Sequence, residues 1–409
     1  MNEGLPASSL MAMPTKETGM SATSTAEPRI AGSTRLLTPA LVRVLVADFG
    51  ALTGFYLLLS VLPGYVVAHG ASSGGAGLTT AALMAATVAA EFVIPRIVAR
   101  FGYRATLAVG LVLLGAPALV LPVLTDLTSV VVVCAVRGLG FAVMVVVGGA
   151  LVAALVPEGR RGEGLGVLGL VAGVPGVIAL PAGIWLVGVV GHPVVFVVAA
   201  LTALLPLLAV RGLPEPAPAG TGSEPTTGMA AALRTPALTR PAVVFATTAV
   251  AAGVIVTFLP LAVPGWSGQL AALALLVHAA TATATRWWAG RYGDRHGPVR
   301  LVVPGMAVTA AGLLVLVIGA EPAAVLVGAA VFGAGFGVVQ SATMALMLSR
   351  VTPSRYGLVS ALWNLGYDAG YGVGAAGFGA LVGATGFQVG WAVLAMLVLV
   401  GLALGRRDS

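Results

Sequence analysis

Long apolar runs alternate with short polar segments along most of this chain. A helix needs about 20 mostly apolar residues to cross the hydrocarbon core of a bilayer, and the pattern predicts twelve such spans. The first six are residues 44–67, 78–98, 105–123, 129–156, 165–188 and 193–210. The second six are residues 242–264, 268–289, 301–319, 323–349, 358–382 and 386–405. We therefore expect an all-α polytopic membrane protein with twelve transmembrane helices.

Two polar segments divide the chain. Residues 1–40 are rich in Ser, Thr, Pro, Ala and Gly and show no apolar period, which predicts a disordered tail. Residues 211–240 contain LPEPAPAGTGSEPTTG, a composition typical of a flexible linker. The chain is thus predicted to form one six-helix bundle over 41–210 and a second over 241–409, which ends in a short tail.

Arginines collect in alternate loops. The chain carries 21 Lys and Arg against 14 Asp and Glu, a net charge of +7. Nearly all arginines fall on one side of the predicted spans, whereas the clearly charged residues of the other loops are Asp126 and Glu321. Because Lys and Arg are retained in cytoplasmic loops, we expect a multi-pass protein of the plasma membrane with both termini in the cytoplasm. The same bias accounts for the basic excess without nucleic-acid binding.

Composition narrows the chemistry further. With 58% hydrophobic and 9% charged residues, the chain lies far from a soluble enzyme, which is about one quarter charged. Its single cysteine, Cys134, excludes an intrachain disulfide and a multi-cysteine metal site. No Walker A motif and no nucleophile grouped with a base is visible. We expect neither a cofactor nor a metal, and a membrane-embedded enzyme is the less favoured alternative.

The two predicted halves resemble each other. Residues 137–162 align without a gap to residues 332–357, with matching glycines and a matching arginine. Residues 91–104 match residues 286–300 around the Arg-x-Gly of each half. Such repeats are common in transporters, and their spacing predicts that the halves are copies of one six-helix unit.

A loop motif identifies a family resemblance. The segment from Gly290 to Arg300, GRYGDRHGPVR, resembles the loop signature of the major facilitator superfamily. The first-half copy is degraded, since Pro95 and Ala99 replace the glycine and the aspartate. Arg137-Gly138-Leu139-Gly140 is similar to the arginine motif of proton-driven members, and the Gly/Pro-rich span 165–188 is similar to that of drug:proton antiporters. The resemblance implies two pseudo-symmetric bundles that rock around a central cavity.

The same resemblance implies a conformational latch at this loop. It would consist of Gly290, Asp294, Arg295, Gly297 and Arg300. Asp294 is expected to sit at the N-terminus of the 165–188 helix, near Gly162 to Gly164, where free amides and the helix dipole favour an anion. The alternative is that Asp294 pairs with Arg291 or Arg295 in a solvated loop. The missing aspartate at Ala99 puts the first-half latch in doubt.

Four ionisable residues fall inside predicted spans, where a charge is costly. They are Asp48, Glu91, Arg137 and Asp368. We expect an Asp48–Arg137 pair, either as a proton-coupling switch or as a static ion pair. Glu91 is either a coupling carboxylate or an interfacial charge. Asp368 either faces a water-filled cavity or contacts Asn364 in helix packing.

Aromatic and amide side chains supply the candidates for the cavity wall. These are Phe55, Tyr56, Phe258, Gln340, Trp363 and Asn364. Together with the buried charges they predict a monomeric secondary transporter whose partners are a small-molecule substrate, protons and the lipid bilayer. We expect proton-coupled efflux of small, moderately hydrophobic compounds. The alternative is an importer or facilitator of sugars or organic acids with the same fold.

Overall fold

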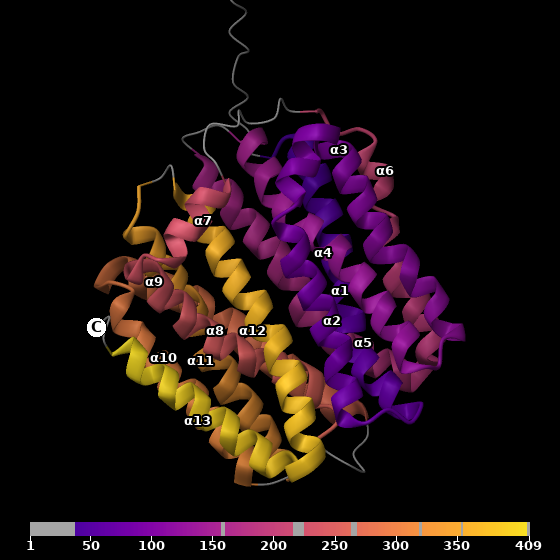
Figure 1. The fold of residues 1–409 in the computed structure, drawn as a ribbon, viewed down its shortest axis with the longest axis vertical. Helices are drawn as coiled ribbons and strands as arrows, with labels where there is room; N and C mark the ends of the chain where they lie inside the picture. The colour runs from indigo at the N-terminus through magenta and orange to yellow at the C-terminus, as the bar shows by residue number, and fades with distance from the viewer. Residues whose placement is uncertain are drawn as a thin grey trace, which may run out of the picture. The chain divides into compact units, whose positions relative to one another are not determined.

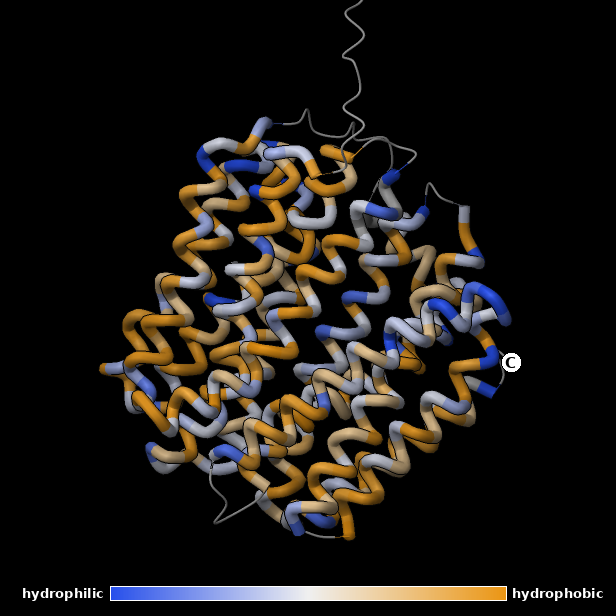
Figure 2. Tube along the Cα trace, turned by 180° about the vertical axis from the view of Figure 1, so that it is seen from behind, coloured by the Kyte–Doolittle hydropathy of each residue, from blue (hydrophilic) through white to orange (hydrophobic). Residues whose placement is uncertain are grey.

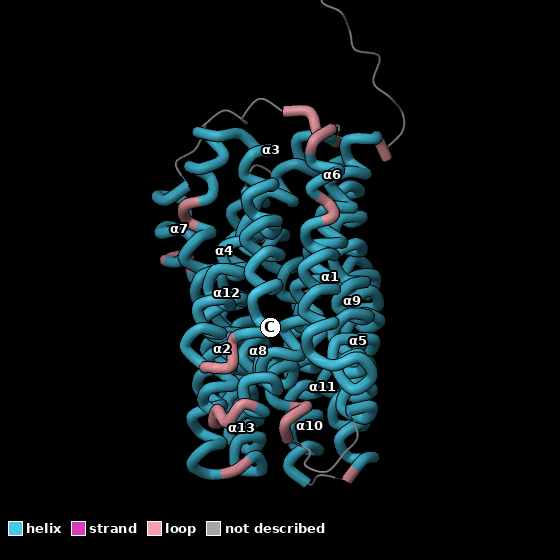
Figure 3. Tube along the Cα trace, turned by 90° about the vertical axis from the view of Figure 1, so that its right-hand side faces the viewer, coloured by secondary structure: helices cyan, strands magenta, loops and turns pink. Residues whose placement is uncertain are grey.

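The computed structural model describes residues 37–156, 160–215, 225–262, 268–318, 321–352 and 355–406. Most of the predicted tail, residues 1–36, therefore lies outside the described residues. Leu37–Ser409 form one compact unit. Within the described residues the regular elements are all helices, and most run along the long axis of the view (Figure 3).

The helices follow the predicted spans. In the first half they are α1 (Pro39–Ala68), α2 (Ser73–Glu91), α3 (Ile94–Gly115) with the short 3-10 helix η1 (Ala116–Val123), α4 (Leu127–Leu155), α5 (Arg161–Leu204) and α6 (Leu207–Val210). In the second half they are α7 (Pro225–Leu233), α8 (Pro236–Phe258), α9 (Gly268–His296), α10 (Val299–Ile318), α11 (Pro322–Ser349), α12 (Tyr356–Thr385) and α13 (Phe387–Gly405). Helices of the first half gather on one side of the view and those of the second half on the other (Figure 1).

Length and apolar composition support membrane insertion. Among the described residues, nine helices are long and apolar enough to cross a bilayer, and α13 contains a shorter apolar stretch. One of the nine, α5, corresponds to two predicted spans. The two spans are separated at Gly191, where φ is 79° and the backbone is not helical. All twelve predicted spans are thus essentially helical where they are described. The prediction of an all-α polytopic membrane protein is confirmed.

Helix starts follow from local sequence. Thr38 precedes α1, and its hydroxyl accepts a hydrogen bond from the amide of Leu41 at 3.2 Å. Asp126 precedes α4, and its carboxylate accepts from the amide of Ser129 at 2.8 Å. This bond lowers the pKa of Asp126, because the amide stabilises the charged form. Such caps satisfy amides that the first helical turn leaves free.

Several boundaries differ from the prediction. The predicted span 78–98 is interrupted after Glu91, where α2 ends, and its last residues belong to α3. Helix α7 lies in the segment expected to be a flexible linker, and α8 begins at Pro236 rather than near residue 242. Helix α9 continues to His296, so the loop motif up to that residue is helical. The polar composition of these segments did not predict that they are helical. A helix at a membrane surface can carry polar residues on the side that faces water.

The structure shows that the two halves pack alike. A side chain at Gly138 of α4 would overlap the carbonyl oxygen of Leu83 in α2, and one at Gly333 of α11 would overlap that of His278 in α9. Gly102 and Gly297 both adopt positive φ, at 82° and 88°, which L side chains rarely adopt. The glycines matched by sequence thus occupy matching structural positions.

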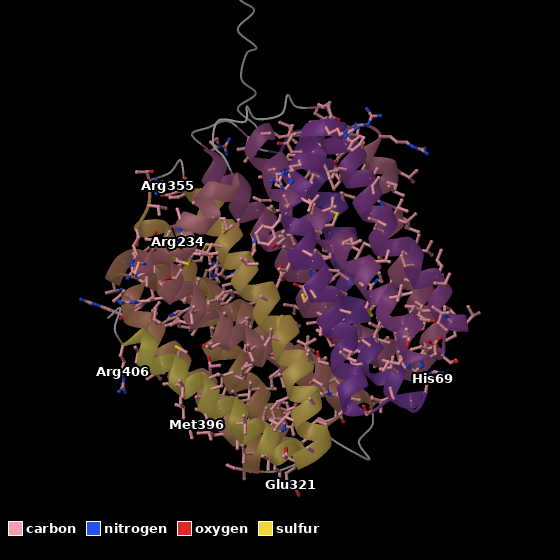
Figure 4. The ribbon with its side chains drawn as sticks, in the orientation of Figure 1. His69, Arg234, Glu321, Arg355, Met396 and Arg406 are labelled. Carbon is pink, nitrogen blue, oxygen red and sulfur yellow. The ribbon has the colours of Figure 1, made fainter. Side chains whose placement is uncertain are left out.

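Charge placement is visible at the ends of the helices. Arg355 and Arg234 lie toward the upper left of the view and Arg406 at its left edge, whereas Glu321 lies at the bottom and His69 at the lower right (Figure 4). We call the end of the helices that carries Arg234 and Arg355 the arginine-rich end. Hydrophilic residues are most frequent near the ends, but several lie along the middle of the helices (Figure 2). The buried ionisable residues Asp48, Arg137 and Asp368 are the starting point for the candidate site.

Candidate functional site

The two halves meet most closely at the end opposite the arginine-rich end. A side chain at Gly77 of α2 would overlap the carbonyl oxygen of Ala375 in α12, and one at Gly379 would lie 2.6 Å from that of Ser73. The hydroxyls of Thr80 and Thr257 also join α2 to α8 at 3.0 Å. Small residues permit such close backbone packing between membrane helices.

Toward the arginine-rich end, part of the surface of α5 faces open space. Near the other end, the start of α9 lies against α5, with a Cβ at Gly268 3.8 Å from Ile184. By contrast, a Cβ at Gly166, Gly169 or Gly173 of α5 would have no atom within 4 Å among the described residues. The halves are therefore closed at one end, and α5 is open toward the other.

Glu91 and Asp368 form a carboxyl pair between the halves. Glu91 is the last residue of α2, and Asp368 lies in α12, which runs alongside α2 (Figure 1). Their side chains lie within hydrogen-bonding range of each other. Asp368 is only 2% exposed, and Glu91 Oε1 is buried without a partner among the described residues. Two carboxylates contain no donor, so a hydrogen bond between them requires one proton.

Arg286 of α9 faces the same region. It lies within electrostatic range of Tyr56 in α1 and Tyr367 in α12. Tyr56 is in turn within range of Asp368 and Asp48. Although these neighbours come from both halves, the Arg286 side chain is exposed. An exposed cation among such residues indicates that solvent reaches the space between the halves.

An aromatic stack supports this region from the second half. The rings of Phe245 and Trp363 stack with centroids 4.1 Å apart, and Trp363 lies parallel to Tyr367 at 6.2 Å. The indole N–H of Trp363 donates to the Thr343 hydroxyl at 3.2 Å. Because Trp363 is only 6% exposed, its main contribution is to pack against Tyr367. It forms little of the exposed surface.

The other cavity candidates divide between packing and the half-buried surface. Phe55 stacks on Phe141 at 3.8 Å, and Phe258 packs against Phe378 at 5.1 Å, so both are buried in helix packing. Gln340 and Asn364 are half-buried. Tyr56 joins the charged residues although its neighbour Phe55 does not, since adjacent helical residues point about 100° apart.

The expected Asp48–Arg137 pair is wrong for this conformation. Arg137, 1% exposed, donates to the carbonyl oxygens of Leu114 and Gly54, each at 3.1 Å. Asp48 instead faces Gly148, whose Cβ position lies 3.2 Å from its Oδ1. Gly148 lies about 16 Å along α4 from Arg137, at 1.5 Å per residue. The two charges are therefore at different depths.

The expected latch residues lie at the end of α9 and the start of α10. Asp294, Arg295 and Arg300 are exposed. Within the described residues, Asp294 makes no ion pair with Arg291 or Arg295, and the Arg291 guanidinium lies 4.3 Å from the Trp287 ring centre. The surroundings of the Gly162 position lie outside the described residues. Near it, Glu163 pairs with Arg160 at 2.8 Å, which lowers the pKa of Glu163. The latch stays a prediction.

Sequence reasoning missed Arg286 as a site residue. It counted Arg286 among the loop arginines, because the predicted span ended at residue 289, only three residues later. The helix continues to His296, which places Arg286 deeper. The available signal was the internal duplication, which aligns Arg286 with Glu91 and so puts opposite charges at equivalent positions. Among the described residues, no three His, Cys, Asp or Glu side chains form a metal site.

Comparison with known proteins agrees with this architecture. A profile of the Major Facilitator Superfamily matches residues 44–287 and 243–408. No curated protein sequence matches the chain.

Solved structures share the fold at low sequence identity. One is a bacterial homolog of the human lysosomal transporter Spinster in an inward-facing, occupied conformation (14% identity, 91% of this chain and 97% of that chain, TM-score 0.78). Others are the nucleoside transporter NupG (14%, 91% and 99%, 0.71) and the xylose transporter XylE from E. coli (14%, 90% and 98%, 0.73). At such identities these structures show the fold alone.

Proposed function

Because the chain belongs to the Major Facilitator Superfamily, we propose that it is a secondary transporter that exports small, moderately hydrophobic compounds in exchange for protons. The observation that carries the proposal is the Glu91–Asp368 carboxyl pair, which joins α2 of one half to α12 of the other. A proton bound between the halves can be coupled directly to their relative movement.

The carboxyl pair supplies a physical switch. With one proton, Glu91 and Asp368 attract each other through a hydrogen bond. Without it, two carboxylates about 4 Å apart repel by about 4 kcal/mol at an effective dielectric constant of 20. Loss of the proton thus favours separation of α2 from α12, and protonation favours their contact. A difference of this size is enough to shift a balanced equilibrium by more than tenfold.

The surrounding residues fit a compound that is partly apolar and partly polar. Tyr56 and Tyr367 offer ring faces and hydroxyl groups from opposite halves, and Phe245 and Trp363 continue the aromatic surface behind Tyr367. Arg286 adds one exposed cation. Sites of this kind combine apolar walls with a few placed polar groups.

The proposed orientation follows the arginines. Arg234 and Arg355 lie toward one end of the helices, and Glu321 and His69 near the other (Figure 4). By the positive-inside rule, we assign the arginine-rich end and both termini to the cytoplasm of a plasma-membrane protein that acts as a monomer. The opening beside α5 would then face the cytoplasm, from which an exporter collects its substrate.

Proton flux in liposomes tests the proposal. Purified protein is reconstituted with a trapped pH dye and challenged with a panel of aromatic amines, organic acids, nucleosides and sugars. Wild-type protein should move protons against the flow of at least one compound. Asp368→Asn should abolish this flux while exchange of substrate for substrate persists, whereas Glu321→Gln, an exposed residue whose side chain makes no cap bond, should behave as wild type. Proton movement in the same direction as the substrate would favour the importer alternative, and normal flux in Asp368→Asn would refute the carboxyl switch.

A further inference from the structure

An apolar groove lies on the first half, outside the site between the halves. It has a volume of about 590 Å³ and runs between α2, α3 and α4. Its wall includes Ala90, Ile97, Phe101, Val109 and Leu139. Phe101 is 60% exposed, and Val109 and Leu139 are also exposed. The groove therefore offers an extended apolar surface on α3.

A basic pocket adjoins this groove. It has a volume of about 410 Å³ and shares Phe101 and Ala105 with the groove. Arg104 of α3 and Arg211, just after α6, contribute its cations. Both α3 and α6 reach the arginine-rich end (Figures 1 and 3). The apolar groove thus leads into a pocket with two arginines near the arginine-rich end of the helices.

The one carboxylate in the pocket is already engaged. Glu215 accepts hydrogen bonds from the backbone amides of Tyr103 and Arg104. It reaches them because Gly102 has no side chain, and a Cβ there would overlap the Glu215 carboxylate. Within the described part of the chain, the guanidinium groups of Arg104 and Arg211 make no hydrogen bond or ion pair. Two cations therefore line the pocket beside one carboxylate, and neither of them is paired with it.

We infer that this composite surface, the α3 lipid site, binds an anionic phospholipid. Its phosphate would lie between Arg104 and Arg211, since guanidinium groups bind phosphate through paired hydrogen bonds. One acyl chain would pass Phe101 and occupy the groove. The charge of the pocket selects an anionic headgroup, and the groove selects a molecule with a long apolar chain. Basic pockets between membrane helices are suited to such headgroups.

Competition between lipids tests this site directly. Protein in micelles that contain equal amounts of phosphatidylglycerol and phosphatidylcholine is analysed by native mass spectrometry. Wild-type protein should retain phosphatidylglycerol in preference. The double variant R104Q/R211Q should lower the ratio of retained phosphatidylglycerol to phosphatidylcholine by about tenfold. The matched control R234Q/R240Q removes two exposed arginines of the second half and should leave the ratio unchanged.

Two further arms distinguish a lipid from a free phosphate and from a general charge effect. Ala105→Phe fills the passage between pocket and groove without changing charge, and it should also lower phosphatidylglycerol retention. Glycerol phosphate at equal concentration, which has no acyl chain, should not displace the lipid. Thermal unfolding in lipid-free detergent checks that each variant is folded. An equal ratio in wild-type and R104Q/R211Q protein, an equal loss in R234Q/R240Q, displacement by glycerol phosphate, or normal retention in Ala105→Phe would each overturn the assignment.

Discussion

The two halves share their helix packing and differ in the chemistry of equivalent side chains. Gly138 and Gly333 allow the same close contact in each half, between α4 and α2 and between α11 and α9. The residue just before each glycine is Arg137 in one half and Phe332 in the other, both almost fully buried. Close backbone contact tolerates little change, whereas the preceding position holds a hydrogen-bonded arginine in one half and a phenylalanine ring in the other.

The same contrast places opposite charges across the molecule. Glu91 at the end of α2 corresponds to Arg286 in α9. Glu91 meets Asp368, and Arg286 meets Tyr56 and Tyr367. One copy of the repeat thus supplies an acidic side chain, Glu91, and the other a basic side chain, Arg286, to the region between the halves. Duplication provides two equivalent positions, and divergence of single residues makes the site asymmetric.

The largest expected effect comes from replacing Arg137 with the residue of the other half. Arg137→Phe removes the donors to the Leu114 and Gly54 carbonyls and leaves these acceptors without that partner. Each hydrogen bond made by a charged group is worth about 1.5–3 kcal/mol, and this variant loses two of them. We expect a clear fall in the midpoint of thermal unfolding, which is measured by tryptophan fluorescence. Arg100→Gln, an exposed arginine, should shift it little; equal stability of the two variants would mean that Arg137 is not structural.

The matched glycines should give similar and smaller losses. Gly138→Ala and Gly333→Ala each force a methyl group against a backbone carbonyl, and overpacking of this kind costs about 1–3 kcal/mol. Unfolding midpoints should fall by similar amounts in both variants. Gly149→Ala has open space around its Cβ position and serves as the control. A loss confined to one half would show that the pseudo-symmetry does not extend to energetics.

Arg286 and Glu91 should affect different steps of transport. Arg286→Gln removes an exposed charge beside Tyr56 and Tyr367, and hydrogen bonds to charged groups are worth about 1.5–3 kcal/mol. We expect apparent affinity for an anionic or strongly polar substrate to fall about tenfold with the proton stoichiometry unchanged. Glu91→Gln should do the reverse, weakening the pH dependence of transport. Parallel losses in both parameters for both variants would argue against this division of roles.

The smallest effect is expected at the loop motif. Asp294→Asn should insert and express normally but shift the accessibility of the two membrane faces to thiol reagents. A charge at a helix N-terminus is worth about 0.3–1 kcal/mol at an exposed site, which changes the balance between nearly equal conformers by a few fold. Glu215→Gln provides the comparison in the first half, where a carboxylate binds the start of the helix after Gly102. If Asp294→Asn leaves both transport and accessibility unchanged, the latch is absent.

Local sequence was sufficient for the fold because membrane spans depend on neighbouring residues. A run of apolar residues predicts a helix without knowledge of its partners, and the alternating arginines predict its direction. The duplication also emerged from sequence, since the glycines that contact carbonyls in α4 and α11 recur at the same spacing. Residues such as Glu91, Asp368 and Tyr56 were identified one at a time as costly or amphipathic groups inside spans.

Only the tertiary structure decided which of these residues meet. The sequence placed Asp48 and Arg137 close enough for a contact. A contact also requires that the two residues lie at the same depth and that their helices are rotated so that the side chains face each other. Arg137 lies opposite Gly54, while Asp48 faces Gly148. Glu91 and Asp368 are far apart in sequence, and they meet because α2 packs along α12. The relative height of two helices depends on packing along their whole length, so no pattern within a single span contains it.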